Sequence, residues 1–269
     1  NGPNQWPLNF PDLKGAMLQY FDELPYTVAV VGAGSGIGKA AAELIGAMGA
    51  SVGCLDKDGE AAEDTAQTIE AAGGKACSYA MDVTDSAGTA RALDHVDDIL
   101  GAVSGLVNCA GITGKTALKG AEVDLDDFDL VHDINVRGAL IVSQAVLPGM
   151  LTRGYGRLLH VSSISGKEGN AGMLAYSTSK AGLIGLVKVL GKDYAESGVT
   201  INAVAPAVVR TPMVDVLPEE TVTYMTDKIP MKRCCELDEV ARMIAWIVSP
   251  ACSFNTGYVF DLTGGRATY

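Results

Sequence analysis

The segment from residue 27 to 48 constrains the fold of this chain more than any other. Thr27-Val-Ala-Val-Val31 is short and apolar, as a fully buried strand would be, and it runs directly into Gly32-Ala-Gly-Ser-Gly36-Ile-Gly38 and then into a helical run over 39–48. Glycines permit a tight turn and a close approach of backbone N–H groups to a ligand, and the helix N-terminus adds partial positive charge. This order predicts a phosphate-binding cradle in a parallel α/β sheet.

The glycine spacing, G-x-x-x-G-x-G, is a variant of the common dinucleotide fingerprint. Taken alone it is also compatible with an ordinary turn, because the chain contains 32 glycines. A second predicted strand over 51–55 ends at Asp56, about twenty residues after the turn, where a carboxylate can accept hydrogen bonds from an adenosine ribose. That context favours dinucleotide binding.

Tyr176 and Lys180 lie one turn apart on a predicted helix and so share one of its faces. A free phenol has a pKa of about 10, and a fixed neighbouring cation is expected to bring it closer to neutrality, which would make the tyrosine a usable base. Most such pairs are ordinary neighbours on an amphipathic helix. The functional interpretation therefore depends on the other motifs.

Together these motifs resemble the short-chain dehydrogenase/reductase family, from about residue 26 to the C-terminus. The resemblance implies four catalytic residues: Asn135 in Ile-Asn-Val-Arg-Gly, Ser163 in Ser-Ser-Ile-Ser-Gly, and Tyr176 and Lys180 in the Tyr-x-x-x-Lys motif. Ser162 and Ser165 are the alternatives to Ser163, which fits the S-x-x-G pattern of the family.

The resemblance also implies cofactor contacts from the glycine turn, the ends of the second and third strands, a turn similar to N-N-A-G, and a stretch similar to P-G-x-x-x-T. These contacts are Gly32, Ser35, Gly36, Ile37, Gly38, Asp56, Asp82, Val83, Asn108, Ala110, Gly111, Tyr176, Lys180, Pro206, Val209 and Thr211. The chain departs from the family pattern at Val31, Cys109 and Ala207. These departures bear on loop geometry and remove no reacting group.

The implied activity is hydride transfer between NAD(H) and a secondary alcohol or ketone. By resemblance, Tyr176 exchanges the hydroxyl proton, Ser163 orients the substrate oxygen, Lys180 stabilises the phenolate and holds the nicotinamide ribose, and Asn135 holds a water that leads to solvent. A sensor has no use for such a proton relay. The set therefore favours an enzyme over the alternative of another class, a non-catalytic dinucleotide sensor or scaffold of the same fold.

NAD is predicted in preference to NADP. Asp56 would face the 2′-phosphate of NADP at close range, and Ser35 stands where NADP-preferring relatives place a basic residue. Lys57 could offset part of the repulsion, although a solvated surface position is the simpler interpretation.

Substrate identity is less constrained. Residues 212–235 are predicted to form a substrate lid, and they supply the apolar side chains of Met213, Val214, Val216, Leu217, Tyr224 and Met225. Residues 172–174 would line the opposite wall without a charge. This favours an apolar hydroxyl compound, such as a 3-oxoacyl, cyclic or steroid-like substrate. A sugar-derived polyol is the alternative.

The whole chain is predicted to be α/β, with a single doubly wound parallel seven-stranded sheet of the Rossmann type and helices on both faces. Strands are expected at 27–31, 51–55, 75–80, 104–108, 156–161, 199–205 and 256–260. The 269 residues, 48% of them hydrophobic, suit one domain over 26–269. Residues 1–25 form an N-terminal extension with a possible short helix over 13–21, either a packing arm or an arm that closes a site.

Composition limits partners and location. A net charge of −12 argues against nucleic acid, and no apolar run reaches the roughly 18 residues of a membrane span. The six cysteines form no regular framework, which predicts reduced thiols and a cytoplasmic location, and the three histidines lack metal-ligand spacing, so no metal is expected. Predicted helices around 122–148 and 175–196 resemble those through which family members form homotetramers.

Overall fold

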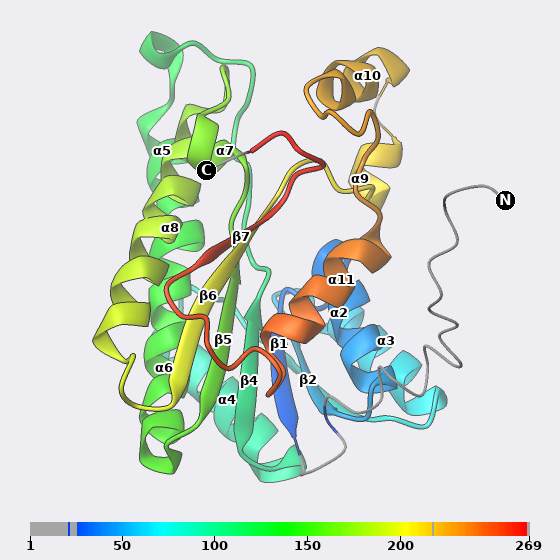
Figure 1. Cartoon of the computed structure of the whole chain (residues 1–269), viewed down its shortest axis with the longest axis vertical. Helices are drawn as coiled ribbons and strands as arrows, with labels where there is room; N and C mark the ends of the chain where they lie inside the picture. The colour runs from blue at the N-terminus through cyan, green and yellow to red at the C-terminus, as the bar shows by residue number, and fades with distance from the viewer. Residues whose placement is uncertain (1–20, 22–25, 217, 268–269) are drawn as a thin grey trace, which may run out of the picture.

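The computed structural model describes residues 21, 26–216 and 218–267, and these form a parallel seven-stranded sheet in the order β3-β2-β1-β4-β5-β6-β7 (Figure 1). The strands are β1 Thr27–Val31, β2 Ser51–Asp56, β3 Lys75–Ala80, β4 Val103–Asn108, β5 Gly156–Val161, β6 Val199–Pro206 and β7 Val259–Leu262. The order reverses direction between β1 and β4, as in doubly wound sheets. The predicted fold class is confirmed.

Helices cover both faces of this sheet (Figure 1). They are α2 Gly36–Ala47, α3 Gly59–Ala71, α4 Ser86–Leu100, α5 Leu125–His132, α6 Gly138–Arg153, α7 Ser165–Glu168, α8 Leu174–Asp193, α9 Pro212–Asp215, α10 Glu219–Asp227 and α11 Leu237–Ile247. The helices α2, α3 and α11 pack on one face, and α4, α6 and α8 pack on the other. Alternate residues of β1 enter the two cores: Val28 and Val30 on the first face, Ala29 and Val31 on the second.

Several boundaries differ from the sequence prediction, and two of these differences have a local structural cause. The last strand begins at Val259 instead of residue 256, because Gly257 adopts a left-handed φ of +68° in the bend that precedes the strand. The predicted helix 122–148 is a run from Leu125 to Arg153 that contains a π-helical turn, Asp133–Arg137. A π-helical turn shifts the side chains after it around the helix axis, which periodicity in the sequence does not reveal.

The same run, Leu125–Arg153, is long and apolar enough to cross a membrane by length and composition alone. However, 50% of its most apolar window is buried inside the protein, because α6 packs on the sheet. The run is thus accounted for as a core helix.

Of the N-terminal extension, only Phe21 belongs to the described residues. Its ring is buried and lies 5.1 Å, centroid to centroid, from that of Tyr26. The helix predicted over 13–21 otherwise lies outside the described residues.

Candidate active site

The glycine turn after β1 has the geometry of a ligand cradle. Gly32 and Gly36 adopt positive φ angles of +82° and +52°, which favour glycine. A Cβ on Gly38 would lie 2.0 Å from the carbonyl oxygen of Gly32, so only glycine lets α2 begin this close to the strand. The turn thus leads directly into the N-terminus of α2, where free N–H groups and the helix dipole favour an anion.

Asp56, at the end of β2, is held beside this turn. Its Oδ2 accepts a hydrogen bond of 2.8 Å from the Gly34 N–H, and its Oδ1 accepts one of 3.0 Å from the Asp58 N–H. The carboxylate is thus fixed next to the cradle, at the place predicted for ribose recognition. The close packing also explains Gly34, since a Cβ there would lie 2.9 Å from Asp56 Oδ2.

Lys57 does not pair with Asp56 in this structure. Its Nζ lies 2.9 Å from Asp82 Oδ2, and the lysine side chain is exposed. Hydrogen bonds from the Thr84 backbone and from Lys57 hold the pKa of Asp82 at about 2, so this carboxylate stays ionised. Asp56 ends β2 and Asp82 follows the neighbouring strand β3, and Lys57 pairs with Asp82.

The turn Asn108–Gly111 forms a second wall of the cradle. The Cys109 N–H donates to the Val31 carbonyl oxygen over 2.8 Å, and a Cβ on Gly32 would lie 3.0 Å from the Ala110 nitrogen. At its far end the turn approaches the predicted catalytic residues, because a Cβ on Gly111 would lie 3.2 Å from Lys180 Nζ. The turn thus connects the cradle with the catalytic residues.

Asn135 lies buried in the π-helical turn with its side chain fully engaged. Its Oδ1 accepts from the Ile112 N–H, and its Nδ2 donates to the Ile112 carbonyl and to Ser179 Oγ, each over 2.9 Å. Both amide N–H groups are therefore used by the protein. The water-holding role that the sequence resemblance implied for Asn135 stays a prediction.

The remaining predicted catalytic residues meet at the carboxyl end of β5. Ser163 follows that strand, and Tyr176 and Lys180 lie on successive turns of α8. Lys180 Nζ donates to the Val161 carbonyl over 2.8 Å and lies 5.7 Å from the centroid of the Tyr176 ring. Burial lowers the pKa of Lys180 to about 8.

The structure distinguishes among the neighbouring serines. Ser162 Oγ donates to the Lys180 carbonyl, and Ser165 Oγ accepts from Asn170 Nδ2. Ser163 Oγ accepts from the Ser165 N–H over 3.1 Å and is also hydrogen-bonded to Tyr176, where it lowers the pKa of the phenol. Ser163 is therefore the serine that contacts Tyr176, as the S-x-x-G pattern predicts.

One expectation about Tyr176 is wrong in this structure. Burial raises the pKa of its phenol, and this effect of burial is larger than the opposing effect of the hydrogen bond to Ser163. Lys180, held by Val161, does not bring the phenol toward neutrality as its spacing suggested. The structure thus shows a phenol whose pKa is shifted upward by burial.

The segment after β6 completes the surroundings of the cradle. The Thr211 methyl lies 3.7 Å from the place a Cβ on Gly36 would take. Val209 is buried and pairs with Cys235, and Pro206 ends β6. By contrast, Val83 packs against Gly138 of α6, where a Cβ would lie 2.7 Å from it, so its side chain belongs to the core.

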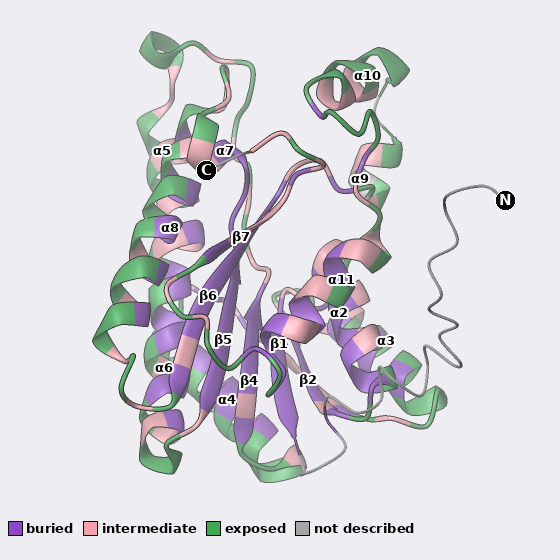
Figure 2. Cartoon of the chain, in the orientation of Figure 1, coloured by how far each residue is buried: buried purple, intermediate pink, exposed green. Residues whose placement is uncertain are grey.

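The predicted lid, residues 212–235, has a fixed part and a projecting part. Residues 229–235 are anchored to the segment after β6: Ile229 and Cys234 are buried, and the Cys235 N–H donates to the Val208 carbonyl over 2.9 Å. Within the predicted lid, α9 and α10 lie at the carboxyl ends of the strands, and α10 extends furthest from the sheet (Figure 1). No residue of α10 is buried, and Figure 2 shows this helix largely exposed. Leu217 and the side chain of Met213 lie outside what the structure describes.

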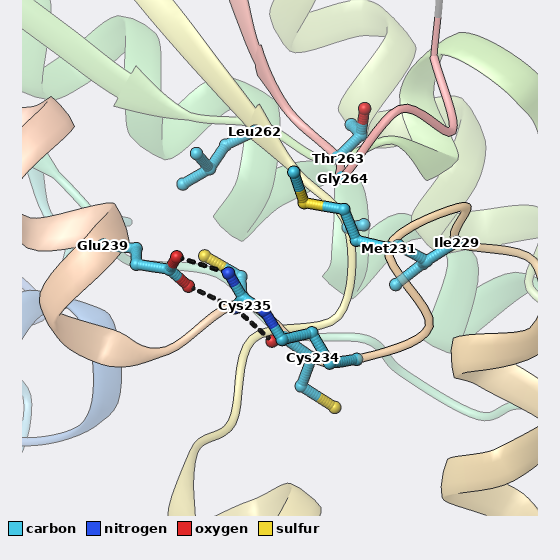
Figure 3. A pocket seen from close by; sticks show the side chains of 10 residues that line it. Ile229, Met231, Cys234, Cys235, Glu239, Leu262, Thr263 and Gly264 are labelled. Atoms are coloured by element: carbon cyan, nitrogen blue, oxygen red, sulfur yellow. Dashed lines mark hydrogen bonds and ion pairs between the residues drawn. The ribbon is translucent and has the colours of Figure 1, made fainter. Parts of the chain in front are cut away.

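A small cavity of about 60 Å³ lies between this anchored segment and the end of β7 (Figure 3). Ile229, Met231 and Leu262 supply apolar walls, and the side chains of Cys234 and Cys235 point to opposite sides of the backbone (Figure 3). None of the four predicted catalytic residues lines it. The cavity is far too small for a dinucleotide, and the Arg233–Glu239 ion pair, with an N–O distance of 2.6 Å, closes one side.

Sequence reasoning missed His160, one of the three histidines that it considered only as metal ligands. The imidazole is completely buried and lies between Asn108 and Ser143, 3.2 Å and 3.0 Å from their nearest polar atoms. The one feature of the sequence that could have indicated its role is its position, because a titratable side chain stands inside the otherwise apolar strand segment Leu-Leu-His-Val.

Comparison with known proteins agrees with this geometry. A family model described as enoyl-(acyl carrier protein) reductase matches residues 32–267. A 2-dehydro-3-deoxy-L-rhamnonate dehydrogenase (NAD(+)) from Sphingomonas sp. is 42% identical over 240 residues, 89% of this chain and 94% of that protein. A 3-oxoacyl-acyl-carrier-protein reductase from Thermotoga maritima is 36% identical over 88% of this chain and 95% of its own length.

A solved short-chain type dehydrogenase/reductase from Mycobacterium ulcerans superposes with a TM-score of 0.85 at 30% identity and covers 90% of this chain and 91% of its own. The chain belongs to the short-chain dehydrogenase/reductase family. It is an oxidoreductase that acts on CH–OH groups, as the motifs predicted.

Proposed function

We propose that the protein is an NAD-dependent dehydrogenase/reductase that interconverts a secondary alcohol and a ketone. The observation that carries this proposal is the convergence of Ser163, Tyr176 and Lys180 at the carboxyl end of β5, next to the glycine cradle and Asp56. The cradle fits a dinucleotide, because Gly38 admits no Cβ and Asp56 is aimed at the turn. NAD is the cofactor, and when bound it supplies or accepts the hydride.

The protein's own groups handle the proton. Tyr176 donates to the ketone oxygen during reduction and takes the proton back during oxidation. Ser163 hydrogen-bonds the same phenol and is placed to orient the substrate oxygen. Lys180, with a pKa of about 8, is a cation near neutral pH that can hold the nicotinamide ribose.

Asn135 is connected to these residues indirectly, through Ser179. Its Nδ2 donates to Ser179 Oγ, and Ser179 Oγ donates to the Tyr176 carbonyl over 2.8 Å. Since its amide is otherwise bonded to Ile112, we assign Asn135 the role of fixing α8 against the loop that follows Gly111. This positioning role is proposed in addition to the water-holding role that the sequence resemblance implied.

The preferred substrates are apolar hydroxyl compounds, including hydroxyacyl thioesters. Exposed apolar side chains at Val216, Tyr224 and Leu174 lie around the carboxyl ends of the strands, where they can cover such a substrate. The 3-oxoacyl reductase and (3R)-3-hydroxyacyl-CoA dehydrogenase relatives support this preference. A sugar-derived hydroxy compound is the second candidate, because the relative at 42% identity acts on a deoxy sugar acid.

A turnover assay tests both candidates. Purified protein is incubated with NAD⁺ and, in separate wells, 3-hydroxyacyl thioesters, cyclic and steroid alcohols, and sugar acids, and NADH is followed by absorbance. The expected result is turnover with one of these classes. Dinucleotide binding without turnover across the whole panel would overturn the enzymatic proposal in favour of a sensor.

We further propose that the protein assembles as a homotetramer in the cytoplasm. A surface groove of about 760 Å³ over α5, α6 and α8 is lined by Leu130, Leu140 and Leu186, and Leu130 is half exposed, so this face offers an apolar contact. All six cysteines are free thiols, in keeping with a reducing compartment. Sedimentation of the wild type against Leu130→Glu tests the assembly, and a monomeric wild type would contradict it.

A further inference from the structure

His160 occupies a position that the proposed mechanism does not use. It lies in the middle of the sheet on β5, with no exposed surface, and a buried polar group of this kind needs a hydrogen-bond partner for each of its nitrogens. Both ring nitrogens have one: Nδ1 lies 3.2 Å from Asn108 Nδ2, and Nε2 lies 3.0 Å from Ser143 Oγ.

The two ends of this chain of hydrogen bonds fix its direction. At one end, the Ser143 hydroxyl lies 2.8 Å from the Ala139 carbonyl, which can only accept, so Ser143 must donate there and accept from His160 Nε2–H. At the other end, the Ala110 N–H can only donate, and it donates to Asn108 Oδ1 over 3.2 Å. Asn108 Nδ2 must then donate to His160 Nδ1.

The result is one continuous chain of hydrogen bonds, called the His160 relay below, in which no proton is transferred. Its donors and acceptors run from the Ala110 N–H to Asn108, from Asn108 to His160, from His160 to Ser143, and from Ser143 to the backbone of α6. Only the neutral Nε2–H tautomer of His160 satisfies it, since a proton on Nδ1 would face the Asn108 amide N–H. Burial, with a smaller contribution from the charge of Lys180, lowers the pKa of His160 to about 4 and so favours this neutral form.

The relay ends at the turn that connects the cradle with the catalytic residues. Ala110 lies against Gly32, and the next residue, Gly111, lies against Lys180 and Asn135. A shift of a few tenths of an ångström in this turn would therefore alter the wall of the cradle and the surroundings of the lysine together.

We propose that His160 is a positioning residue for the cofactor: as a neutral Nε2–H tautomer it orients Asn108, and through it the turn Asn108–Gly111, so that the dinucleotide is bound tightly. The inference rests on the proposed function, because the ligand whose affinity is set is NAD(H). His160 itself is not a group that contacts the reacting atoms.

Two matched substitutions separate this role from simple core packing. His160→Asn places an amide oxygen close to the position of Nδ1, where it can accept from Asn108, and it loses the bond to Ser143. His160→Gln reaches Ser143 and leaves Asn108 without its acceptor. Both remove the ring from the same core position, so a packing role predicts similar losses for the two.

The measurements are the Kd of NADH by fluorescence, kcat and KM with NAD⁺, and amide hydrogen exchange at Ala110 in the unliganded protein. We expect His160→Asn to keep a Kd near that of the wild type and His160→Gln to weaken it about tenfold, since one lost hydrogen bond is worth roughly that factor, with KM rising more than kcat falls. Ala110 exchange should be faster in His160→Gln than in His160→Asn.

Equal Kd values for the two variants would overturn the proposal. Should either variant fail to fold, ¹⁵N spectroscopy of the wild-type imidazole at pH 7 decides, because an Nδ1–H or charged ring there would also overturn it. If the wild type binds no dinucleotide, the proposed function is contradicted instead. The difference in Ala110 amide exchange between His160→Gln and His160→Asn still tests the His160 relay in that case.

Discussion

At the scale of single residues, Tyr176 and its surroundings support the proposed chemistry most directly. The phenol is hydrogen-bonded to Ser163 and lies on the turn before Lys180, and burial raises its pKa. Tyr176→Phe removes only the oxygen. We expect turnover to fall by about 10²–10⁴-fold, as for the loss of general acid–base help, with the Kd of NADH nearly unchanged. Steady-state kinetics and NADH fluorescence measure the two effects.

The matched control for this prediction is Tyr258→Phe, because Tyr258 is half exposed and precedes β7 at the amino end of that parallel strand, whereas the catalytic residues lie at the carboxyl end of β5. It should leave kcat unchanged. Near-wild-type turnover of Tyr176→Phe would rule out the phenol as the proton-transfer group.

Asp56 is the residue expected to select NAD over NADP. Its carboxylate is fixed by Gly34 and Asp58, and Lys57 is drawn away to Asp82, so no cation within the described chain is bonded to it. We expect a preference for NAD of about a hundredfold in kcat/KM, and Asp56→Ala should narrow it mainly by improving NADP. The control is Asp58→Ala, the N-cap of α3, which should leave the ratio unchanged. An unaltered ratio in Asp56→Ala would show that another group selects the cofactor.

At the scale of elements, the junction of β1 and α2 has no room for a side chain. A Cβ on Gly38 would lie 2.0 Å from a backbone oxygen, so Gly38→Ala must push α2 away from the strand. We expect it to lower the free energy of unfolding by about 2–3 kcal/mol and to weaken NADH binding. Urea unfolding and fluorescence titration measure the two effects.

Gly185→Ala provides the comparison for this substitution. Gly185 lies on α8, and an added Cβ there meets no described atom within 4 Å outside the local helix. Alanine should therefore stabilise by about 0.5–1 kcal/mol. Similar effects of the two substitutions would contradict the packing argument at Gly38.

The elements differ in how well the sequence predicted them. β1 and its glycine turn were predictable because an apolar run followed by glycines at fixed spacing has few structural solutions. The inward aim of Asn135 was predictable only through resemblance, since it depends on a π-helical turn that has no clear periodicity. The role of His160 could not be predicted, because its partners come from β4 and α6, which meet only in the folded sheet.

At the scale of the whole molecule, the neutral state of His160 ties stability to pH. The pKa of a histidine is about 6.5 in the unfolded chain and about 4 in the fold. Between these pH values the unfolded chain binds more protons than the folded protein. The stability that neutral His160 contributes is therefore fully present above pH 6.5 and is lost as the pH falls toward 4. We expect the stability advantage of the wild type over His160→Asn to narrow by up to ~3 kcal/mol over that range.

Urea unfolding at several pH values and fixed protein concentration checks this. Carboxylates elsewhere affect both proteins alike, so the difference between the two isolates His160, with Lys180 the one charged group that shifts its pKa. A difference that stays constant from pH 7 to 4.5 would mean that the buried imidazole titrates normally.

Helix α10 contains no buried residue, and its neighbour Val216 is among the most exposed apolar side chains of the described chain. Burial is the main source of folding free energy, so this part of the molecule contributes little to the stability of the rest. Substitutions there should leave the sheet and the proton-transfer residues intact. If α10 covers the substrate, as the predicted lid implies, selection can change substrate preference at this helix almost independently of folding.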